Sequence, residues 1–212
     1  MAQIRPDAVA VQEITPEQAR ALGEVLPFGG LSPSNWYVGM GIALRQPGRV
    51  RTVGLGYREA WIAEVTSGNG TAIELVNVHI RAPHQVPLRH TFRLRREQLR
   101  AIERHVAESP LAPRALIGDF NATSRWPLYR RLARQFTDAA VASARRNGKR
   151  PQPTWRPFSR FPPILRIDHV FVRGLEVHDL QVIAIAGSDH CAVVADVRPS
   201  LPSSNPAEDP PS

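Results

Sequence analysis

Residues 115–124 read "ALIGDFNATS", and this stretch decides the fold. A short apolar run ends at Gly118, after which Asp119 and Asn121 flank Phe120. Alternation along a strand places residues i and i+2 on the same side, so the two polar side chains point together while Phe120 packs the other way. Aspartate and asparagine after a strand often form only a turn, because they bond nearby backbone amides. Directly after a buried strand, the same spacing also suits two convergent oxygen ligands.

Outward from this stretch, short strand patterns are separated by a few helices. Period-2 alternation and short apolar runs predict strands at residues 7–13, 39–45, 59–66, 71–80, 114–120, 166–172, 175–185 and 190–197. Helical patterns cover residues 14–26, 88–107 and 127–136, and the first has Thr15 as N-cap with Gln18 completing a capping box. Without a repeated βαβ rhythm, this order predicts an α+β layered sandwich.

Length and composition indicate one globular domain. The chain has 212 residues, of which 42% are hydrophobic and 22% charged. No apolar run approaches the roughly 20 residues that a membrane span needs. We find no internal repeat and no linker, so residues 1–198 form one predicted domain, and the proline- and serine-rich residues 199–212 form a predicted disordered tail. Cys191 is the single cysteine, which excludes an internal disulfide and favours a reducing compartment.

The chain is strongly basic, with a formal net charge of +8 and a pI of about 11.0. Such a charge favours a polyanionic partner, either nucleic acid or an anionic lipid surface. Nearly all of it is arginine, and Lys149 is the only lysine, so genomic base composition is an alternative cause. On the predicted helix 88–107, apolar residues mark one buried face, and we expect a solvated face made of Arg93, Arg95, Arg96, Arg100 and Arg104.

Polar residues follow or interrupt apolar runs at five strand ends. They are Glu13, His79, Asp119 with Asn121, Asp168, and Asp189 with His190. Strand ends are rigid and face solvent, so chemistry gathers there in open sheets. Oxygen ligands without a cysteine cluster indicate Mg²⁺ or Mn²⁺ rather than zinc. Carboxylate, amide and imidazole around such an ion are the groups that phosphate-ester hydrolysis requires.

Five motifs, in order along the chain, carry a family resemblance: "PDAVAVQE", "NVHI", "GDFNATS", "RIDHVFV" and "GSDHCAVVADV". Together they resemble the endonuclease/exonuclease/phosphatase family, which includes deoxyribonuclease I, abasic-site endonucleases of the exonuclease III type and neutral sphingomyelinases. The resemblance covers Ile4 to Val197. It implies a deoxyribonuclease I-like four-layered α/β sandwich, in which two packed, mainly antiparallel sheets are flanked by helices.

Carried over motif by motif, the resemblance implies a role for each acidic or amide residue at a strand end. Glu13 resembles the principal metal ligand, and Asp189 resembles a second one. Asp119 resembles the residue that orients or deprotonates the attacking water, and Asn121 beside it holds the phosphate or the nucleophile.

The same resemblance implies partners for the histidines. Asp168 resembles the carboxylate that pairs with His190, which would fix the tautomer of the imidazole and favour its protonated form. His79 resembles the histidine that contacts the phosphate or assists the leaving group. Glu59 stands where deoxyribonuclease-like members keep a carboxylate against that histidine. His169 alternates to the side opposite Asp168, so we expect it to pack in the core.

The loop before the "RIDHV" motif supplies candidates for substrate contacts. It is rich in proline and arginine, and its "TW" pair at 154–155 matches an element common in the family. Trp155, Arg160 and Arg166 are therefore candidate substrate-binding residues, although a packing role explains Trp155 equally well. We expect the remaining histidines, His84, His90, His105 and His178, at the surface and Cys191 in the core.

One family element is absent from the sequence. Members begin with a strand of the type "WNV" and a helix, whereas Met1 to Arg5 matches only the end of that helix. We therefore expect two strands to lack a shared neighbour, and we expect the functional protein to extend further at its N-terminus. The default localisation is cytoplasmic, but a longer N-terminus leaves room for a signal or a membrane anchor.

The sequence thus predicts a Mg²⁺- or Mn²⁺-dependent phosphodiesterase, with a monomeric nuclease acting on DNA as the leading hypothesis. A lipid phosphoesterase acting on sphingomyelin or phosphoinositide head groups is an alternative, because the loops that select the substrate cannot be decoded from the sequence. A catalytically inactive, incomplete domain is another.

Overall fold

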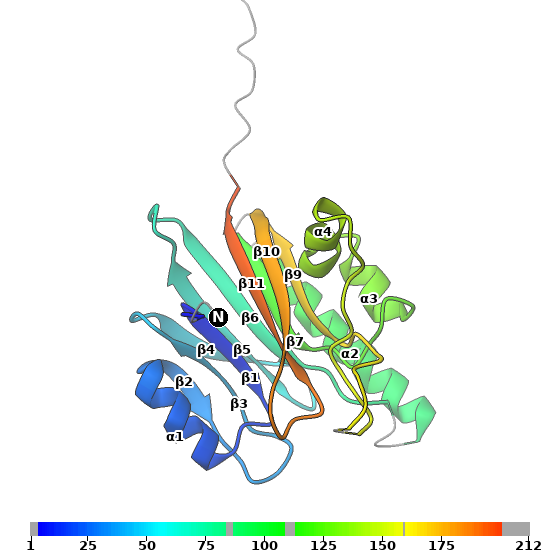
Figure 1. Ribbon diagram of the computed structural model, residues 1–212. Coiled ribbons are helices and arrows are strands. Elements are labelled where there is room, and N and C mark those ends of the chain that lie inside the picture. Colours follow the sequence, from blue (N-terminus) through cyan, green and yellow to red (C-terminus); the bar gives the residue numbers. More distant parts are fainter. Residues whose placement is uncertain (1–3, 84–86, 109–112, 159, 201–212) are drawn as a thin grey trace, which may run out of the picture.

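The computed structural model describes residues 4–83, 87–108, 113–158 and 160–200 (Figure 1). Within them a six-stranded sheet has the order β4-β5-β6-β7-β9-β8, with bounds Arg49–Gly54, Glu59–Thr66, Ala72–His79, Arg114–Asp119, Asp168–Arg173 and Thr137–Asp138. A three-stranded sheet has the order β1-β3-β2, with bounds Ala8–Gln12, Met40–Leu44 and Phe28–Ser32. A further pair consists of β10 (Leu175–Ala184) and β11 (Cys191–Pro199). The helices are α1 (Pro16–Val25), α2 (Leu88–Glu108), α3 (Pro127–Leu132) and α4 (Ala139–Arg146).

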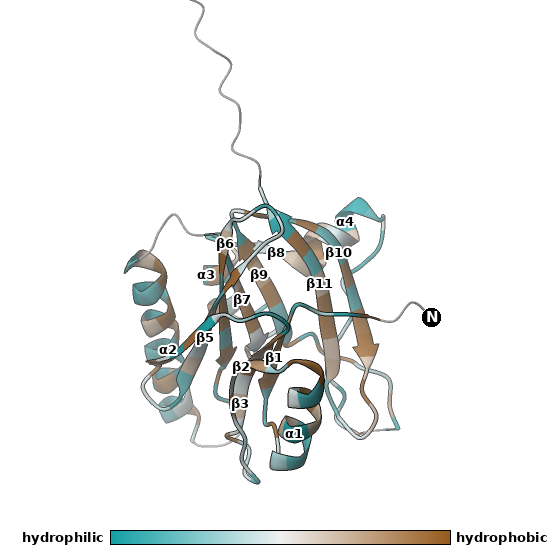
Figure 2. Cartoon of the chain, turned by 90° about the vertical axis from the view of Figure 1, so that its left-hand side faces the viewer, coloured by the Kyte–Doolittle hydropathy of each residue, from teal (hydrophilic) through white to brown (hydrophobic). Residues whose placement is uncertain are grey.

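Two hydrophobic clusters fill the spaces between the layers of the molecule. An outer cluster lies between the six-stranded sheet and the helices α2 and α3, and it includes Ile62, Val76, Val78, Ile102, Leu116, Leu132 and Phe171. An inner cluster lies between the six-stranded sheet and the smaller sheets, and it includes Ile42, Leu44, Ala63, Leu75, Val170 and Val177. Figures 1 and 2 show α2 and α3 on one side of β5, β6 and β7, with β1 and β3 on the other. The predicted α+β sandwich is confirmed.

The capped helix at the N-terminus forms as its sequence predicts. Thr15 caps α1 by accepting a hydrogen bond from the Gln18 backbone, and the Gln18 side chain accepts one from the Thr15 backbone in return. Pro16 occupies the first turn, where its missing N–H costs nothing. Because the helix follows Glu13 directly, its cap also fixes where the chain leaves β1.

In helix α2, two polar residues that were predicted to be exposed lie on the buried face toward the sheet. Arg95 and His105 are buried there, with 3% and 5% of their surfaces exposed, although both were expected at the surface. They lie at helical spacing with the buried Leu99 and Ile102, so they belong to the same face. His90 and His178 are exposed and His169 and Cys191 are buried, as expected. His84 lies outside the described residues.

A buried amide joins the two main layers of strands. Asn77 on β6 is completely buried, and its Nδ2 donates to the carbonyl oxygens of Val11 and Gly41 at 3.0 and 2.9 Å. Its Oδ1 accepts a hydrogen bond from the side chain of Gln12. Since these contacts cross from β6 to β1 and β3, they fix the height of β1, and therefore of Glu13, against the end of β6.

The strands β1 and β11 each have one sheet neighbour among the described residues. β1 pairs with β3 and β11 pairs with β10, both antiparallel. All five residues of β1 are partly exposed, as are most of those in β11. β11 includes Pro199, the first residue of the predicted tail, while the tail from residue 201 lies outside the described part. No helix of the described chain is long and apolar enough to cross a membrane.

A buried ionic network holds the opposite ends of the central strands. The carboxylate of Glu74, on β6, accepts hydrogen bonds from Arg114 on β7 and from His105 on α2, the latter at 3.1 Å. Although burial raises the pKa of Glu74, its hydrogen bond to His105 and the charge of Arg114 lower it below the ordinary 4.5. This contribution to stability is therefore present above pH 4.5 and is lost as the pH falls through the lowered pKa.

Replacing Glu74 with glutamine should destabilise the fold by about 3 kcal/mol at neutral pH, because the variant loses one partner of a buried ion pair. The difference from wild type should shrink as the pH falls below 4.5, since only the wild type loses stability there. Denaturant unfolding at the two pH values measures both effects. Glu64→Gln, at the exposed register partner of Glu74 on β5, is the matched control and should stay within about 0.5 kcal/mol of wild type.

Candidate active site

Three candidate side chains are neighbours across the six-stranded sheet. His79, at the end of β6, is the register partner of Asp119 on β7, which is in turn the register partner of Asp168 on β9. Opposed residues on neighbouring strands have Cβ atoms about 5 Å apart. Ile117 and Val170, two residues away from the aspartates, pack with the inner cluster. Alternation therefore points Asp119 and Asp168 into the space between the sheets.

The carboxylate of Asp119 is held by Asn121. The backbone N–H of Asn121 donates to Oδ1 and its side-chain Nδ2 donates to Oδ2, both at 2.7 Å. Asn121 has a φ of 47°, a left-handed conformation that favours glycine, and Nδ2 also donates to the carbonyl of Ile80 at 3.0 Å. The side chains of Asp119 and Asn121 thus meet, while Phe120 is completely buried in the outer cluster.

The backbone before Asp119 allows no side chain. Gly118 has a φ of 130°, and a Cβ built there would overlap the carbonyl oxygen of Val78 on the neighbouring strand. It would also lie 3.0 Å from Oδ1 of Asn77. The glycine of the "GDFN" motif is therefore needed for the close approach of β6 and β7 at the site.

Glu13, which follows β1 of the three-stranded sheet, lies close to His79 at the end of β6. It has a φ of 57°, and within the described chain it shares a positive φ among non-glycine residues only with Asn121. Its Oε1 lies 3.8 Å from Nε2 of His79, which in turn lies 3.6 Å from Oδ2 of Asp119. Strained backbone of this kind clusters at functional sites.

His190 and Asp168 form a pair at the third side of the site. Nδ1 of His190 donates to the Asp168 carboxylate at 3.0 Å, and the hydroxyl of Thr154 donates to the same carboxylate at 2.5 Å. Asp189, next in the chain, is exposed, and its Oδ2 accepts a hydrogen bond from the Trp155 indole at 3.0 Å. Loop 154–155 therefore supports both aspartates.

Burial and neighbouring charges shift the pKa values of the titratable groups of the site in different directions. Burial, together with the charge of Asp168, raises the pKa of Asp119 to about 8. Burial and the nearby Arg58 and His190 lower the pKa of His79 to about 3. Although burial opposes it, the hydrogen bond to Asp168 and the surrounding carboxylates raise the pKa of His190 to about 9. At neutral pH His79 is therefore neutral and His190 is a cation.

The carboxylates of the site are oxygen donors of the kind that a hydrated divalent cation prefers. Burial raises the pKa of Glu13; the charges of His190 and Arg58 oppose this increase, and the nearby carboxylate of Asp189 adds to it. In the described residues no three His, Cys, Asp or Glu side chains are placed around one point, as a closed protein cage would require. Mg²⁺ keeps several waters and is bound through one or two carboxylates, so it does not require a closed protein cage.

Two expectations about individual residues are corrected. Glu59 is exposed, and Nδ1 of His79 instead lies 2.8 Å from a guanidinium nitrogen of Arg58. Arg166, expected to contact substrate, is partly buried and donates to Asp138 at 2.7 Å and to Nδ1 of His169 at 2.9 Å, so its guanidinium has structural partners instead.

The remaining substrate candidates differ in how they are held. Trp155 forms backbone bridges to both Leu165 and His190, which favours a structural role for it beside its contact with Asp189. Arg160 is exposed.

Three supporting residues lie at the site without having been singled out as site residues. They are Arg58, Thr154 and Arg95. Arg95 is buried and donates to the carbonyl oxygens of Phe120 and Asn121 at 3.3 and 3.1 Å, which holds the loop after β7. The helical period of α2 could have placed Arg95 on the buried face, whereas no sequence pattern indicates the contact of Arg58 with His79.

The chain is similar to known proteins in both sequence and fold. The sequence profile described as "Endonuclease/Exonuclease/phosphatase family" matches residues 1–190. No curated protein matches the sequence. Many solved structures share the fold at low sequence identity, and three of them serve as examples.

An endonuclease/exonuclease/phosphatase family protein from Bacteroides thetaiotaomicron is 17% identical with a TM-score of 0.71, over 92% of this chain and 84% of that one. TDP2 of D. rerio, humanized by mutations, is 19% identical with a TM-score of 0.71, over 91% and 86%. The catalytic domain of human Nocturnin with bound sulfate is 18% identical with a TM-score of 0.65, over 92% and 82%. These structures support the deoxyribonuclease I-like fold predicted from the sequence.

Proposed function

Because the chain belongs to the endonuclease/exonuclease/phosphatase family, whose members are phosphoesterases, we propose that it is a divalent-metal-dependent phosphodiesterase. The observation that carries the proposal is a chain of neighbouring side chains at strand ends: Glu13 lies near His79, His79 near Asp119, and Asp119 accepts hydrogen bonds from Asn121. The carboxyl group of Asp119, with its pKa raised to about 8, lies there beside the neutral imidazole of His79 and the cationic imidazole of His190. Pairs of groups whose pKa values are pushed apart are typical of acid–base catalysis.

Each residue has a distinct task in one-step attack of water on phosphorus. Asp119, held by Asn121, takes a proton from the attacking water in its ionised form, and its pKa of about 8 means that the population of this form grows as the pH rises toward 8. His190, kept cationic by Asp168, donates to the phosphoryl oxygens and stabilises the charge that develops on them. His79 lies on one side of Asp119, and Asp168 with His190 lies on the other. From its side, His79 contacts a phosphoryl oxygen or the leaving group. The ester oxygen leaves as the water oxygen bonds to phosphorus.

Glu13 and Asp189 would hold the metal ion, and Mg²⁺ bound there would neutralise negative charge on the phosphoryl group. At a concentration 100 times its Kd, Mg²⁺ should stabilise the fold by about 2.7 kcal/mol, which raises the Tm by roughly 5–10 °C for a chain of this length. Thermal melting with and without Mg²⁺ measures the shift. Glu13→Gln should remove most of it, whereas Glu17→Gln, an exposed change in the first turn of α1, should keep it.

Release of phenolate from a bis-aryl phosphate tests the proposed reaction itself. We expect release by the wild-type chain with Mg²⁺ and little release with a chelator. A chain that releases no phenolate and melts at the same temperature in both conditions would instead support the inactive domain. The two assays together therefore separate an enzyme from an inert fold.

Nucleic acid is the leading substrate class that we propose. The net charge of +8 and the exposed Arg160 support it, although the expected contact of Glu59 with His79 no longer does. Plasmid nicking at rising salt concentration is the measurement, because phosphate contacts make binding fall steeply with salt. Intact plasmid together with hydrolysis of sphingomyelin would reverse this preference.

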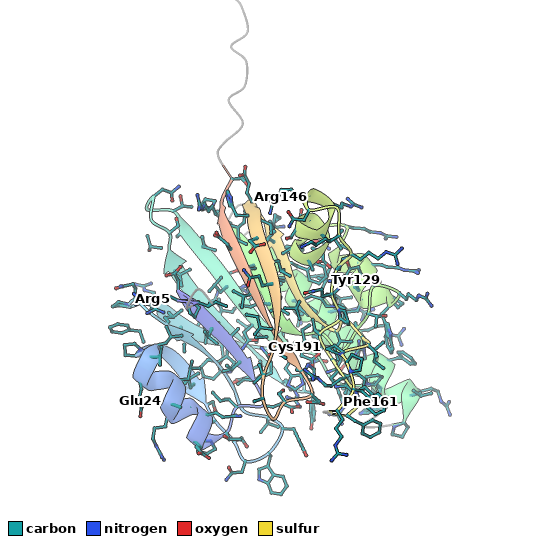
Figure 3. All side chains as sticks on the ribbon, viewed as in Figure 1. Arg5, Glu24, Tyr129, Arg146, Phe161 and Cys191 are labelled. Carbon is teal, nitrogen blue, oxygen red and sulfur yellow. The ribbon has the colours of Figure 1, made fainter. Side chains whose placement is uncertain are left out.

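Exposed apolar side chains favour the lipid alternative as a second candidate. They lie in the loop between β2 and β3, beside Arg58, and in the loops before β9 and β11: Trp36, Tyr37, Val38, Tyr57, Phe158, Phe161, Ile164 and Ile185. The rings of Phe158 and Phe161 are in contact, with their centroids 5.9 Å apart. Figure 3 shows Phe161 at the lower edge of the molecule, below Cys191, which follows His190. Large aromatic residues of this kind suit a membrane–water interface.

A further inference from the structure

Arg58 and His79 form a contact that no sequence pattern indicates. A terminal nitrogen of the Arg58 guanidinium lies 2.8 Å from Nδ1 of His79. A guanidinium carries only donors and stays protonated, so Nδ1 must be the acceptor. An imidazole ring turned by half a rotation would place a carbon there and lose the hydrogen bond.

The other edge of the ring meets acceptors. Nε2 of His79 faces Oε1 of Glu13 at 3.8 Å and Oδ2 of Asp119 at 3.6 Å. A neutral imidazole that accepts at Nδ1 carries its hydrogen on Nε2, on the side where the acidic groups of Glu13 and Asp119 lie. His79 is 4% exposed, so bulk water competes little with Arg58 for Nδ1.

From this geometry we infer that Arg58 is a positioning residue, which fixes His79 as its Nε2–H tautomer. In that form His79 donates a hydrogen bond to an oxygen of the bound phosphoryl group and does not accept a proton at Nε2. The part that concerns the phosphoryl group rests on the proposed function, whereas the tautomer does not. A carboxylate in the place of Arg58 would accept from Nδ1 and impose the opposite arrangement.

Arg58 is itself held chiefly by charge. It is half-buried, it faces the carboxylates of Glu13 and Asp119, and its Nε is buried without a partner in the described chain. Its contact with His79 is the hydrogen bond that the structure gives to this guanidinium. Substitution of Arg58 should therefore act on His79 before it acts on the rest of the fold.

Long-range ¹H–¹⁵N correlation NMR on the histidine-labelled protein tests the tautomer directly, with His79→Gln assigning the signal. We expect the wild-type hydrogen on Nε2. Arg58→Lys should keep it there, because lysine still donates to Nδ1, and Arg58→Glu should place a hydrogen on Nδ1. A wild-type hydrogen on Nδ1, or a pattern unchanged in Arg58→Glu, would overturn the inference.

Kinetics on the bis-aryl phosphate with Mg²⁺ test the consequence. Arg58→Met should lower kcat by about 10- to 100-fold with little change in KM, and Arg58→Lys should recover part of it. Arg49→Met, an exposed arginine on the preceding strand, is the matched control and should leave kcat unchanged. An Arg58→Met chain with wild-type kcat would overturn the positioning role. An inactive wild-type chain whose His79 hydrogen still moves in Arg58→Glu would support the tautomer inference and reject the proposed function.

Discussion

Asp119→Asn should lower kcat on a bis-aryl phosphate by about 1,000-fold, the loss expected when a general base is removed. The amide has nearly the shape of the carboxylate, so substrate binding and the packing around Phe120 should persist. It cannot take a proton from water, and it can accept only one of the two hydrogen bonds that Asn121 donates. Initial rates at saturating substrate and Mg²⁺ measure the effect.

Asp196→Asn is the control for this change. Asp196 is an exposed aspartate on β11, away from the strand ends that form the site, so its variant should hydrolyse the substrate at the wild-type rate. Circular dichroism of Asp119→Asn must show a folded chain. Retention of more than a tenth of the wild-type kcat by a folded Asp119→Asn chain would remove Asp119 from the role of base.

Gly118→Ala should have the largest effect on stability, more than about 4 kcal/mol. The new Cβ would overlap the carbonyl oxygen of Val78, which is part of the central β6–β7 pairing and has no room to move. The φ of 130° adds strain of its own. Since a domain of this kind has only about 5–15 kcal/mol of stability, much of the variant should unfold or remain insoluble. Denaturant unfolding and the soluble yield measure the loss.

Gly148→Ala separates the overlap from the backbone strain. Gly148 follows α4 with a φ of 62°, but a Cβ there meets no atom within 4 Å. Its variant should therefore lose only about 1 kcal/mol, the cost of an unfavourable φ. Equal losses at the two glycines would show that the close approach of β6 and β7 is not what requires Gly118.

The sequence allowed the site to be predicted where polar residues break an apolar pattern. Glu13, Asp119 and His190 each stand at the end of a run whose alternation is clear, and the structure brings them together. Their contacts depend on which strands pair and in which register, which a single sequence does not contain. The direct opposition of His79, Asp119 and Asp168 is of this kind, and so is the replacement of Glu59 by Arg58 at His79.

The elements that were missed have weak patterns for physical reasons. β2 ("FGGLS") and β4 ("RVRTVG") are mostly exposed, so their sequences carry glycine and arginine where a buried strand would carry apolar residues. α4 was missed although Asp138 caps it, with its carboxylate accepting from the backbone of Ala140 and Val141. Because its sequence is rich in alanine, its two faces differ little in hydrophobicity, and the helical period is hard to recognise. Arg95 and His105 were misplaced because polarity was given more weight than helical spacing.

The separation of β1 from β11 has a practical consequence for handling the protein. Among the residues that the structure describes, each strand pairs along one edge, so its other edge presents backbone donors and acceptors next to half-exposed apolar side chains such as Val193. An extended segment of any other polypeptide can add to such a row. Concentrated solutions should therefore be prone to association by intermolecular strand addition. Activity and stability of the monomer are best measured in dilute solution.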